Sequence, residues 1–284
     1  MSKSIEQSVK DKMKQVAKDQ EVPFNLVWKH LVLERFLLRL SKSPHEDKFI
    51  FKGGMLLAKY MALGRETTDL DFLLQKVQAQ KERLEQLVNE IIAVPVEDGF
   101  VFQNPIVSEL LHLDAQYPMY RVSISAELGQ TKTRFAIDIG VGDAVKDQPL
   151  SIQLTKTPQG PIFEENISLR VYPIEYIFAE KLETACTRGP LNSRMKDYHD
   201  LWLMIEIEGA LDEDKLKKAL KNTFDTRGTK QMKIPVFSNL DLRRMENYWS
   251  RHLKTLTDDL SEVLPQSFAE VYTRINHWIE HSKF

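Results

Sequence analysis

The sequence predicts an α+β protein in which a sheet-forming first part is followed by a helical second part. Three observations support this class. The first forty or so residues have apolar residues at helical spacing, residues 47–155 contain several runs of alternating apolar and polar residues, and helical spacing returns after Pro173. Strands early and helices late are typical of α+β folds. With 284 residues, 42% of them hydrophobic, the chain is long enough for one large domain or two modest ones.

The elements can be placed in order along the chain. Two helices come first, and Pro23 suits the start of the second because the first turn does not need its missing N–H. The expected strands are 47–51, 68–74, 106–113, 120–128, 134–141 and 151–155. The expected later helices are 78–92, 174–187, 194–208, 212–222, 239–255 and 266–281. Pro and Gly residues cluster after residue 157, so we expect domains at 1–165 and 166–284.

Composition limits the partners and the cellular compartment that we expect for the protein. The net charge is -2, so any nucleic-acid surface must be a local patch and not a global positive field. Cys186 is the single cysteine, which excludes a disulfide within the chain and favours a reducing compartment. The polar N-terminus has no signal core, and the most apolar stretch, residues 31–40, carries charges. We therefore expect a soluble, cytoplasmic protein without a membrane partner.

Two carboxylates stand out in the strand expected at 68–74. Alternation along a strand places Asp69 and Asp71 on one face and the apolar residues between them on the other. The Cα atoms of these two residues are then about 7 Å apart. The two carboxylates repel each other unless a cation neutralises them. Mg²⁺ prefers such oxygen ligands together with substrate phosphates. The alternative is a solvated acidic face without a metal.

A third acid occurs in the strand expected at 134–141. Asp138 shares its face with small residues, and an acid in an apolar strand is costly unless it has a partner. If this strand lies beside the first, Asp138 completes a three-carboxylate site, where two metals could act on an attacking oxygen and a leaving pyrophosphate. The alternative is that Asp138 caps a neighbouring loop or accepts a hydrogen bond from it.

A glycine pair offers a candidate phosphate site. Lys52, Gly53 and Gly54 stand between an expected strand and an expected helix. Glycine lets the backbone approach a phosphate closely, and a helix N-terminus presents unpaired N–H groups. The segment is neither a P-loop nor a dinucleotide fingerprint, and a simple tight turn is the alternative.

The later helices carry three further charged candidates. Lys181 lies at the edge of an apolar stripe, where it can extend to solvent or face an anionic cleft. Asp197 and Asp200 share a helical face, and their simplest partners are Arg194 or Lys196.

Taken together, these motifs resemble a known group of enzymes. Lys-Gly-Gly before a helix, Thr-x-Asp-x-Asp, and a lone Asp in a later strand resemble the DNA polymerase β-type nucleotidyltransferase superfamily. Glu-Lys-Leu at residues 180–182, followed by Arg-x-Lys-Asp-x-x-Asp-Leu at 194–201, resembles more narrowly the AbiEii/AbiGii toxin family. The resemblance covers roughly residues 48–204.

The resemblance implies a fold, an activity and partners. The expected fold is a nucleotidyltransferase-type mixed sheet with flanking helices and a C-terminal helical bundle. The expected activity is Mg²⁺-dependent (or Mn²⁺-dependent) transfer of a nucleotide from a nucleoside triphosphate to RNA, with tRNA as the expected acceptor. Such a protein would be the toxin of a toxin–antitoxin or phage-defence pair, so a cognate antitoxin is an expected partner.

The resemblance also assigns roles to residues. Asp69 and Asp71 would hold metals, with Asp138 as a third acid. The expected nucleotide-binding residues are Lys52, Gly53, Gly54 and Lys181, and the expected catalytic residues also include Asp197 and Asp200. The family often has Ser or Thr directly after Gly-Gly, whereas this chain has Met55.

Other readings stay open from the sequence. The acceptor could be a protein or a small molecule, or the chain could be a non-catalytic module that binds nucleotide, which Met55 favours. Basic residues interleaved with Tyr248 and Trp249 between Lys215 and Lys254 could grip RNA phosphates and stack on bases, or could form ordinary solvated helix faces.

Overall fold

The computed structural model describes residues 2–76, 80–110, 118–142 and 145–282. These residues form two compact units. The first unit comprises Met1–Lys59 and Thr68–Tyr172, and the second comprises Tyr60–Thr67 and Pro173–Phe284. A short segment between two parts of the first unit therefore belongs to the second. The division at Tyr172 falls a little later than the one we expected after residue 165.

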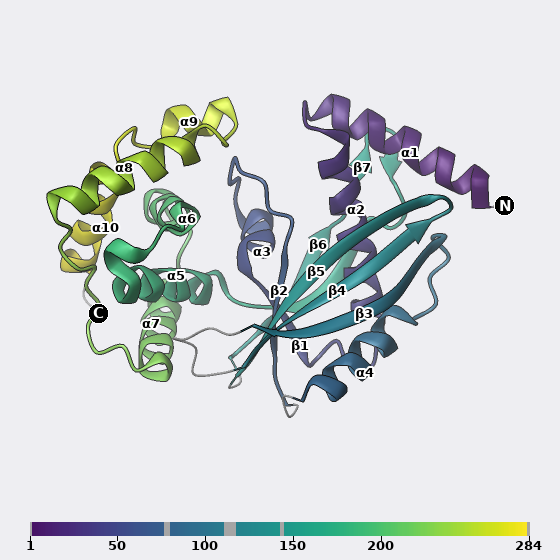
Figure 1. Ribbon diagram of the computed structural model, residues 1–284, viewed down its shortest axis with the longest axis horizontal. Coiled ribbons are helices and arrows are strands. Elements are labelled where there is room, and N and C mark those ends of the chain that lie inside the picture. The colour runs from purple at the N-terminus through teal and green to yellow at the C-terminus, as the bar shows by residue number, and fades with distance from the viewer. Residues whose placement is uncertain (1, 77–79, 111–117, 143–144, 283–284) are drawn as a thin grey trace. The chain divides into compact units, whose positions relative to one another are not determined.

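A seven-stranded mixed sheet is the centre of the first unit, as Figure 1 shows. The strands, given in their order across the sheet, are β3 (Phe100–Leu110), β4 (Met119–Leu128), β5 (Thr131–Val141), β2 (Leu70–Leu74), β1 (Phe49–Lys52), β9 (Asn166–Val171) and β6 (Gln148–Gln153). The pairs β2–β5 and β1–β9 are parallel, and the other neighbours are antiparallel. Two short strands, β7 (Lys156–Thr157) and β8 (Gly160–Pro161), pair separately. The predicted α+β class with a mixed sheet is confirmed.

Four helices accompany this sheet. They are α1 (Ser2–Asp19), α2 (Phe24–Ser41), α3 (Gly53–Tyr60) and α4 (Lys81–Ile92). The helix α2 contacts β5, β9 and α4, and α4 contacts β3. Phe36 of α2 meets Phe72 of β2 and Phe135 of β5 edge to face, so aromatic packing joins helix and sheet into one core.

Two strands differ from the sequence expectation. The strand β3 begins at Phe100 and not at residue 106, while the expected residues 111–113 lie outside the described residues. Pro105 hid this strand from the pattern, and the structure accommodates it at a bulge beside Asn104, which has a positive φ of 55°. The strand β9 was missed because it follows the Pro and Gly cluster. Its Ile167, Leu169 and Val171 are nevertheless buried in regular alternation.

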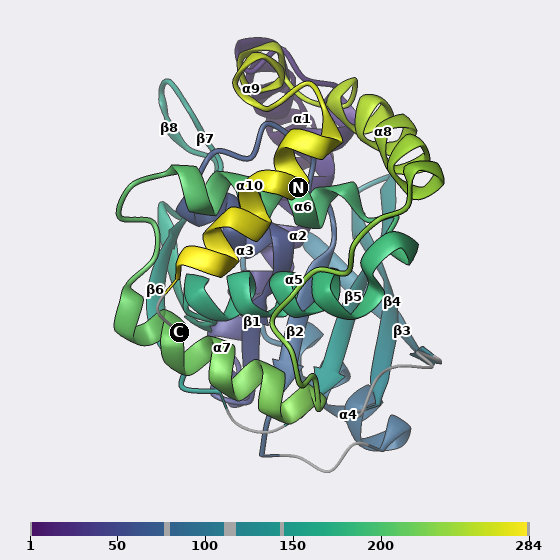
Figure 2. The same ribbon diagram turned by 90° about the vertical axis from the view of Figure 1, so that its left-hand side faces the viewer.

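The second unit is helical, as Figure 2 shows from the side of these helices. Its helices are α5 (Ile174–Arg188), the 3₁₀ turn η1 (Gly189–Leu191), α6 (Met195–Glu206), α7 (Glu213–Arg227), α8 (Asn239–Leu253), α9 (Asp258–Val263) and α10 (Phe268–His281). Tyr198, Trp249 and Phe268 are fully buried at its centre. The segment Tyr60–Thr67 joins this unit in part through a hydrogen bond from the Thr257 backbone N–H to the Gly64 carbonyl, 2.8 Å long.

The five helices expected after Pro173 are all present, and α9 is an addition. Within the described residues, no helix combines the length and the apolar character that crossing a membrane requires.

Candidate functional site

Four charged residues form a row across neighbouring strands of the first unit. Asp71 of β2 stands directly opposite Asp138 of β5 in the parallel pair, which confirms that the two acidic strands are adjacent. Lys52 of β1 stands opposite Asp71, and Arg121 of β4 stands opposite Asp138. Residues directly opposite each other project from the same face of a sheet. We call Arg121, Asp138, Asp71 and Lys52 the acid row, in which two acids lie between two bases.

Asp69 stands just before β2 and is exposed. It is two residues from Asp71, as the predicted pairing required, although the regular strand starts only at Leu70. On the opposite face, Leu70, Phe72 and Leu74 are buried, so the core holds the strand in the register that presents Asp71.

Asp138 has a partner that the sequence did not reveal. Arg121 binds it through two hydrogen bonds, Nε to Oδ1 at 2.8 Å and Nη2 to Oδ2 at 2.7 Å. The hydrogen bonds and charge of Asp138, with smaller contributions from Asp69 and Asp71, raise the pKa of the Arg121 guanidinium. The alternative of a bond from Asp138 to a loop is therefore wrong. Arg121 belongs to no motif, and only the pairing of β4 with β5 brings it to the acid.

Gly53 begins α3 directly after β1, as the sequence predicted. Its φ of +78° lies in the region that favours glycine, and a Cβ there would lie 2.0 Å from Asp71 Oδ2. The Asp71 carboxylate thus occupies the space that a side chain would need, next to the backbone expected to approach a phosphate. Met55 is 5% exposed, so its side chain packs in the core and offers nothing to a phosphate.

The acids of the first unit have the donor chemistry of a magnesium site but do not converge in this conformation. Among the described residues, no three His, Cys, Asp or Glu side chains are grouped closely enough to surround one cation. Asp138 is bound to Arg121, whereas Asp69 is exposed and Asp71 is partly exposed beside Gly53. One or two protein carboxylates are the usual complement for Mg²⁺ when substrate phosphates supply further ligands. Asp69 and Asp71 therefore fit such an ion, and Asp138 fits as a third ligand once Arg121 releases it.

In the second unit, Lys181 lies between two buried acids. Its Nζ is 2.9 Å from Asp197 Oδ1 and 2.8 Å from Asp200 Oδ2. Arg65 binds Asp200 from another side, Nε to Oδ1 at 3.0 Å and Nη2 to Oδ2 at 2.7 Å. The side chains of Asp197 and Asp200 are 1% and 0% exposed, so water cannot compensate their charges. We call Arg65, Lys181, Asp197 and Asp200 the lysine cluster.

The charges of the lysine cluster stabilise one another. Burial alone would lower the pKa of Lys181, but Asp200 and Asp197 outweigh it and the net pKa is raised. Burial likewise would raise the pKa of Asp200, but Lys181 and Arg65 lower it to about 2. Lys181 and Asp200 therefore stay charged at neutral pH.

Two interpretations of these helices from sequence are wrong. Lys181 is only 11% exposed and does not extend to solvent, and Asp200 pairs with Lys181 and Arg65 instead of Lys196. The expected pairing of Arg194 with Asp197 does form, at 2.9 Å. Arg65 was missed because no local spacing connects it to a helix far along the chain.

A histidine pair lies beside the lysine cluster. His199 Nδ1 and His252 Nε2 are 2.9 Å apart, and His199 is 0% exposed. Burial lowers the pKa of His199 to about 3 and that of His252 to about 4. Both rings are therefore neutral at physiological pH.

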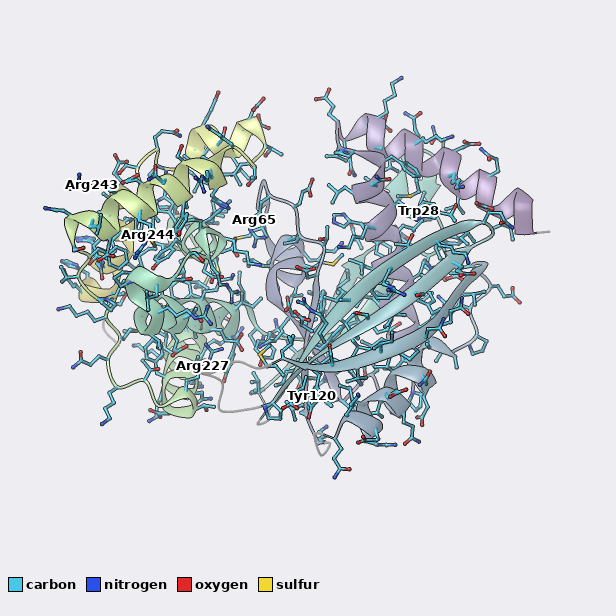
Figure 3. The ribbon with its side chains drawn as sticks, viewed as in Figure 1. Trp28, Arg65, Tyr120, Arg227, Arg243 and Arg244 are labelled. Carbon is cyan, nitrogen blue, oxygen red and sulfur yellow. The ribbon has the colours of Figure 1, made fainter. Side chains whose placement is uncertain are left out.

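The basic and aromatic stretch of the later helices is less available than its sequence indicated. Trp249 is fully buried and donates its indole N–H to the Pro265 carbonyl at 2.8 Å, so the idea that it stacks on a base is wrong. Arg227 and Arg244, labelled in Figure 3, form ion pairs with Glu183 and Asp241.

Comparisons with known proteins identify the family of this chain. The family model described as "Nucleotidyl transferase AbiEii toxin, Type IV TA system" matches residues 35–274. A crystal structure of a Helicobacter pylori protein assigned as a nucleotidyltransferase is 16% identical and aligns with a TM-score of 0.50, covering 91% of this chain and 95% of that one.

Another H. pylori crystal structure, that of JHP933, is 17% identical with a TM-score of 0.46, covering 88% of this chain and 89% of that one. No curated protein sequence matches the chain. Since the family model spans most of the sequence, the protein belongs to the AbiEii family of nucleotidyl transferases, the toxins of type IV toxin–antitoxin systems.

Proposed function

We propose that this protein transfers a nucleotide from a nucleoside triphosphate to an RNA acceptor, with tRNA as the acceptor class and Mg²⁺ or Mn²⁺ as the cofactor. The observation that carries the proposal is the placement of Asp71 directly opposite Asp138, with the Asp71 carboxylate lying against Gly53 at the start of α3. Acids and a glycine-rich helix start thus meet at one place on the sheet, which is the combination that nucleotidyl transfer requires.

Each residue of the first unit has a proposed task. Asp69 and Asp71 hold the divalent cation, which when bound neutralises charge on the phosphates and the leaving pyrophosphate. The backbone at Gly53 and Gly54 orients the triphosphate. Asp138 accepts the proton of the acceptor hydroxyl as that oxygen bonds to the α-phosphorus and pyrophosphate departs. Arg121 occupies one acceptor site on each oxygen of Asp138, and a carboxylate has about four such sites, so Asp138 can still accept this proton.

The lysine cluster has a positioning task in this proposal. Asp197 and Asp200 bind Lys181 from two sides, which holds its ammonium in one orientation and keeps it charged. By the family resemblance, Lys181 contacts the phosphates of the nucleotide, and a fixed point charge suits that contact. Most of the catalytic effect would come from positioning and charge neutralisation.

The test compares the wild type with Asp71→Ala. Each protein is incubated with Mg²⁺, one labelled nucleoside triphosphate at a time, and total cellular RNA. We expect the wild type to label a band of tRNA size and Asp71→Ala to lose at least about a hundredfold in rate, since it loses a principal metal ligand. Asp11→Ala, which removes an exposed acid of α1, is the matched control and should retain full activity.

The outcomes separate the remaining readings. Near-wild-type labelling by a folded Asp71→Ala protein would refute the site assignment. If the label enters protein or a small molecule but not RNA, the acceptor belongs to that class and not to RNA. Tight nucleotide binding without transfer to any acceptor would favour a binding module.

A further inference from the structure

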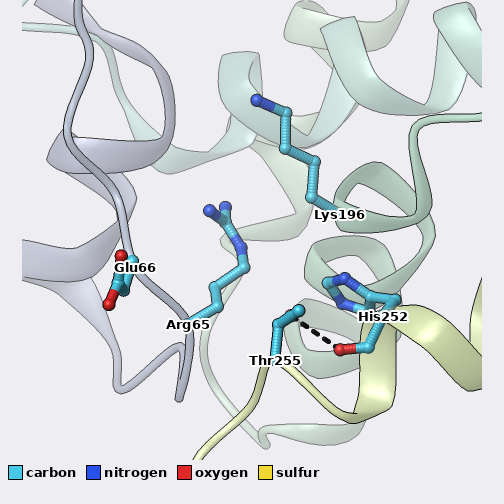
Figure 4. A pocket seen from close by; sticks show the side chains of 5 residues that line it. All are labelled: Arg65, Glu66, Lys196, His252 and Thr255. Carbon is cyan, nitrogen blue, oxygen red and sulfur yellow. Dashed lines mark hydrogen bonds between the residues drawn. The ribbon is translucent and has the colours of Figure 1, made fainter.

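A pocket of about 480 Å³ lies in the second unit and shares Arg65 with the lysine cluster. It is lined by Arg65, Glu66, Lys196, His252 and Thr255 (Figure 4). Arg65 and Glu66 come from the segment Tyr60–Thr67, Lys196 from the first turn of α6, and His252 from the last turn of α8. Its volume is in the usual range for small-molecule sites.

Two cationic side chains that line this pocket have N–H donors available to a ligand. Arg65 uses Nε and Nη2 on Asp200, while none of the described residues accepts a hydrogen bond from its Nη1. Lys196 is exposed and forms no ion pair with any described residue. Figure 4 shows the side chains of Arg65 and Lys196 extending in a similar direction, each with its charged group at the free end.

Charge and geometry together select the class of ligand. The pocket lining holds two cations and one carboxylate, that of Glu66, while Asp200 pairs with Arg65 from outside the lining and His252 adds no charge at neutral pH. A guanidinium with a free amino group and a nearby ammonium match the oxygens of a phosphate, the former by direction and the latter as a point charge.

We propose that this pocket is a phosphate-binding subsite in which Arg65 and Lys196 bind the oxygens of one phosphate group. The proposal rests on the proposed function, because the phosphate belongs either to the nucleoside triphosphate or to the backbone of the acceptor RNA.

The subsite would be linked to the lysine cluster through one residue. Arg65 binds Asp200 on one side and faces the pocket on the other, and Asp200 also binds Lys181. A guanidinium has five N–H donors, so a phosphate can bind at Nη1 while both bonds to Asp200 remain. Occupancy of the pocket thus restrains the same Arg65 side chain that holds Asp200 in place.

The test uses Lys196→Gln, which removes one pocket charge and no ion pair. Lys12→Gln, on the exposed face of α1, is the matched control because it changes the net charge equally and lies outside the basic stretch of the later helices. Each protein is titrated in separate experiments with a non-hydrolysable nucleoside triphosphate and with unlabelled total tRNA, each alone so that no transfer occurs. We expect Lys196→Gln to weaken the binding of one of these ligands about tenfold relative to Lys12→Gln, the effect of one charge-assisted hydrogen bond.

The two arms identify the source of the phosphate. Weaker triphosphate binding with unchanged tRNA binding assigns the subsite to the nucleotide. Weaker tRNA binding, with a log–log salt slope that is shallower by about 0.7 to 0.9, assigns it to the RNA backbone. If Lys196→Gln binds both ligands as tightly as Lys12→Gln does, the proposal is overturned. A wild type that transfers nothing to RNA, while Lys196→Gln still weakens phosphate binding, would refute the proposed function and leave the subsite standing.

Discussion

The acid row and the lysine cluster use the same charged residue types in opposite ways. In the acid row, the Asp138 side chain is 17% exposed and its partner Arg121 is 48% exposed. In the lysine cluster, Asp200 is 0% exposed and bound by both Lys181 and Arg65. The acids of the sheet therefore keep contact with solvent, whereas those of the helices have exchanged solvent for fixed counter-charges.

This difference determines what each region can do. A buried charge is tolerated only with well-placed partners, so removing one partner leaves another charge uncompensated. The lysine cluster is consequently part of the folded framework of its unit. A partly exposed acid with a half-exposed partner can exchange that partner for a ligand at lower cost, which suits the acid row to binding.

The largest expected effect is on stability in the lysine cluster. Asp200→Ala leaves Lys181 and Arg65 without their shared counter-charge, and we expect the free energy of unfolding to fall by about 3–5 kcal/mol. Urea unfolding followed by circular dichroism measures this change. Asp138→Ala in the acid row is the comparison and should cost under about 1 kcal/mol. Equal losses of unfolding free energy in the two variants would contradict the distinction between the lysine cluster and the acid row.

An intermediate effect concerns pH. The pKa of His199 is lowered to about 3 in the folded protein, below its ordinary value of 6.5, so the unfolded chain binds a proton that the folded protein does not. Stability is therefore fully present above about pH 6.5 and declines as pH falls toward 3, by up to about 1.4 kcal/mol per pH unit for this ring. Denaturation between pH 7 and 5 measures the slope. A His199→Gln protein should show a shallower slope, and an unchanged slope would contradict the assignment to His199.

The smallest expected change in stability is at Arg121. Arg121→Gln removes a half-exposed ion pair, so the free energy of unfolding should change by less than about 1 kcal/mol. Affinity for Mn²⁺, followed by electron paramagnetic resonance, should rise several-fold because no guanidinium competes for Asp138. A weaker affinity would mean that Arg121 helps to form the metal site and does not occlude it.

The sequence predicted the acid row better than it predicted the lysine cluster. Alternation alone placed Asp71 on one face of its strand, and the structure confirms that the strand of Asp138 lies beside it. Alternation gives the face of a residue but not its partner on the next strand, so Arg121 could not be predicted.

For the helices, local spacing favoured a pair between Lys196 and Asp200, which does not form. The actual partner, Arg65, is 135 residues away, and no periodic pattern records a contact of that range. The resemblance to a family, and not spacing, associated Lys181 with these acids.

The segment Tyr60–Thr67 also affects the order in which the acid row and the lysine cluster can form during synthesis. During synthesis, Arg65 leaves the ribosome well before Asp200, and every strand of the large sheet is made between or before them. A fragment that starts at Pro173 would lack Arg65 and leave Asp200 short of a counter-charge, so one cut of the chain cannot separate the two units intact. A growing chain consequently carries the complete acid row before it can assemble the lysine cluster, and it must extend past Asp200 to possess both.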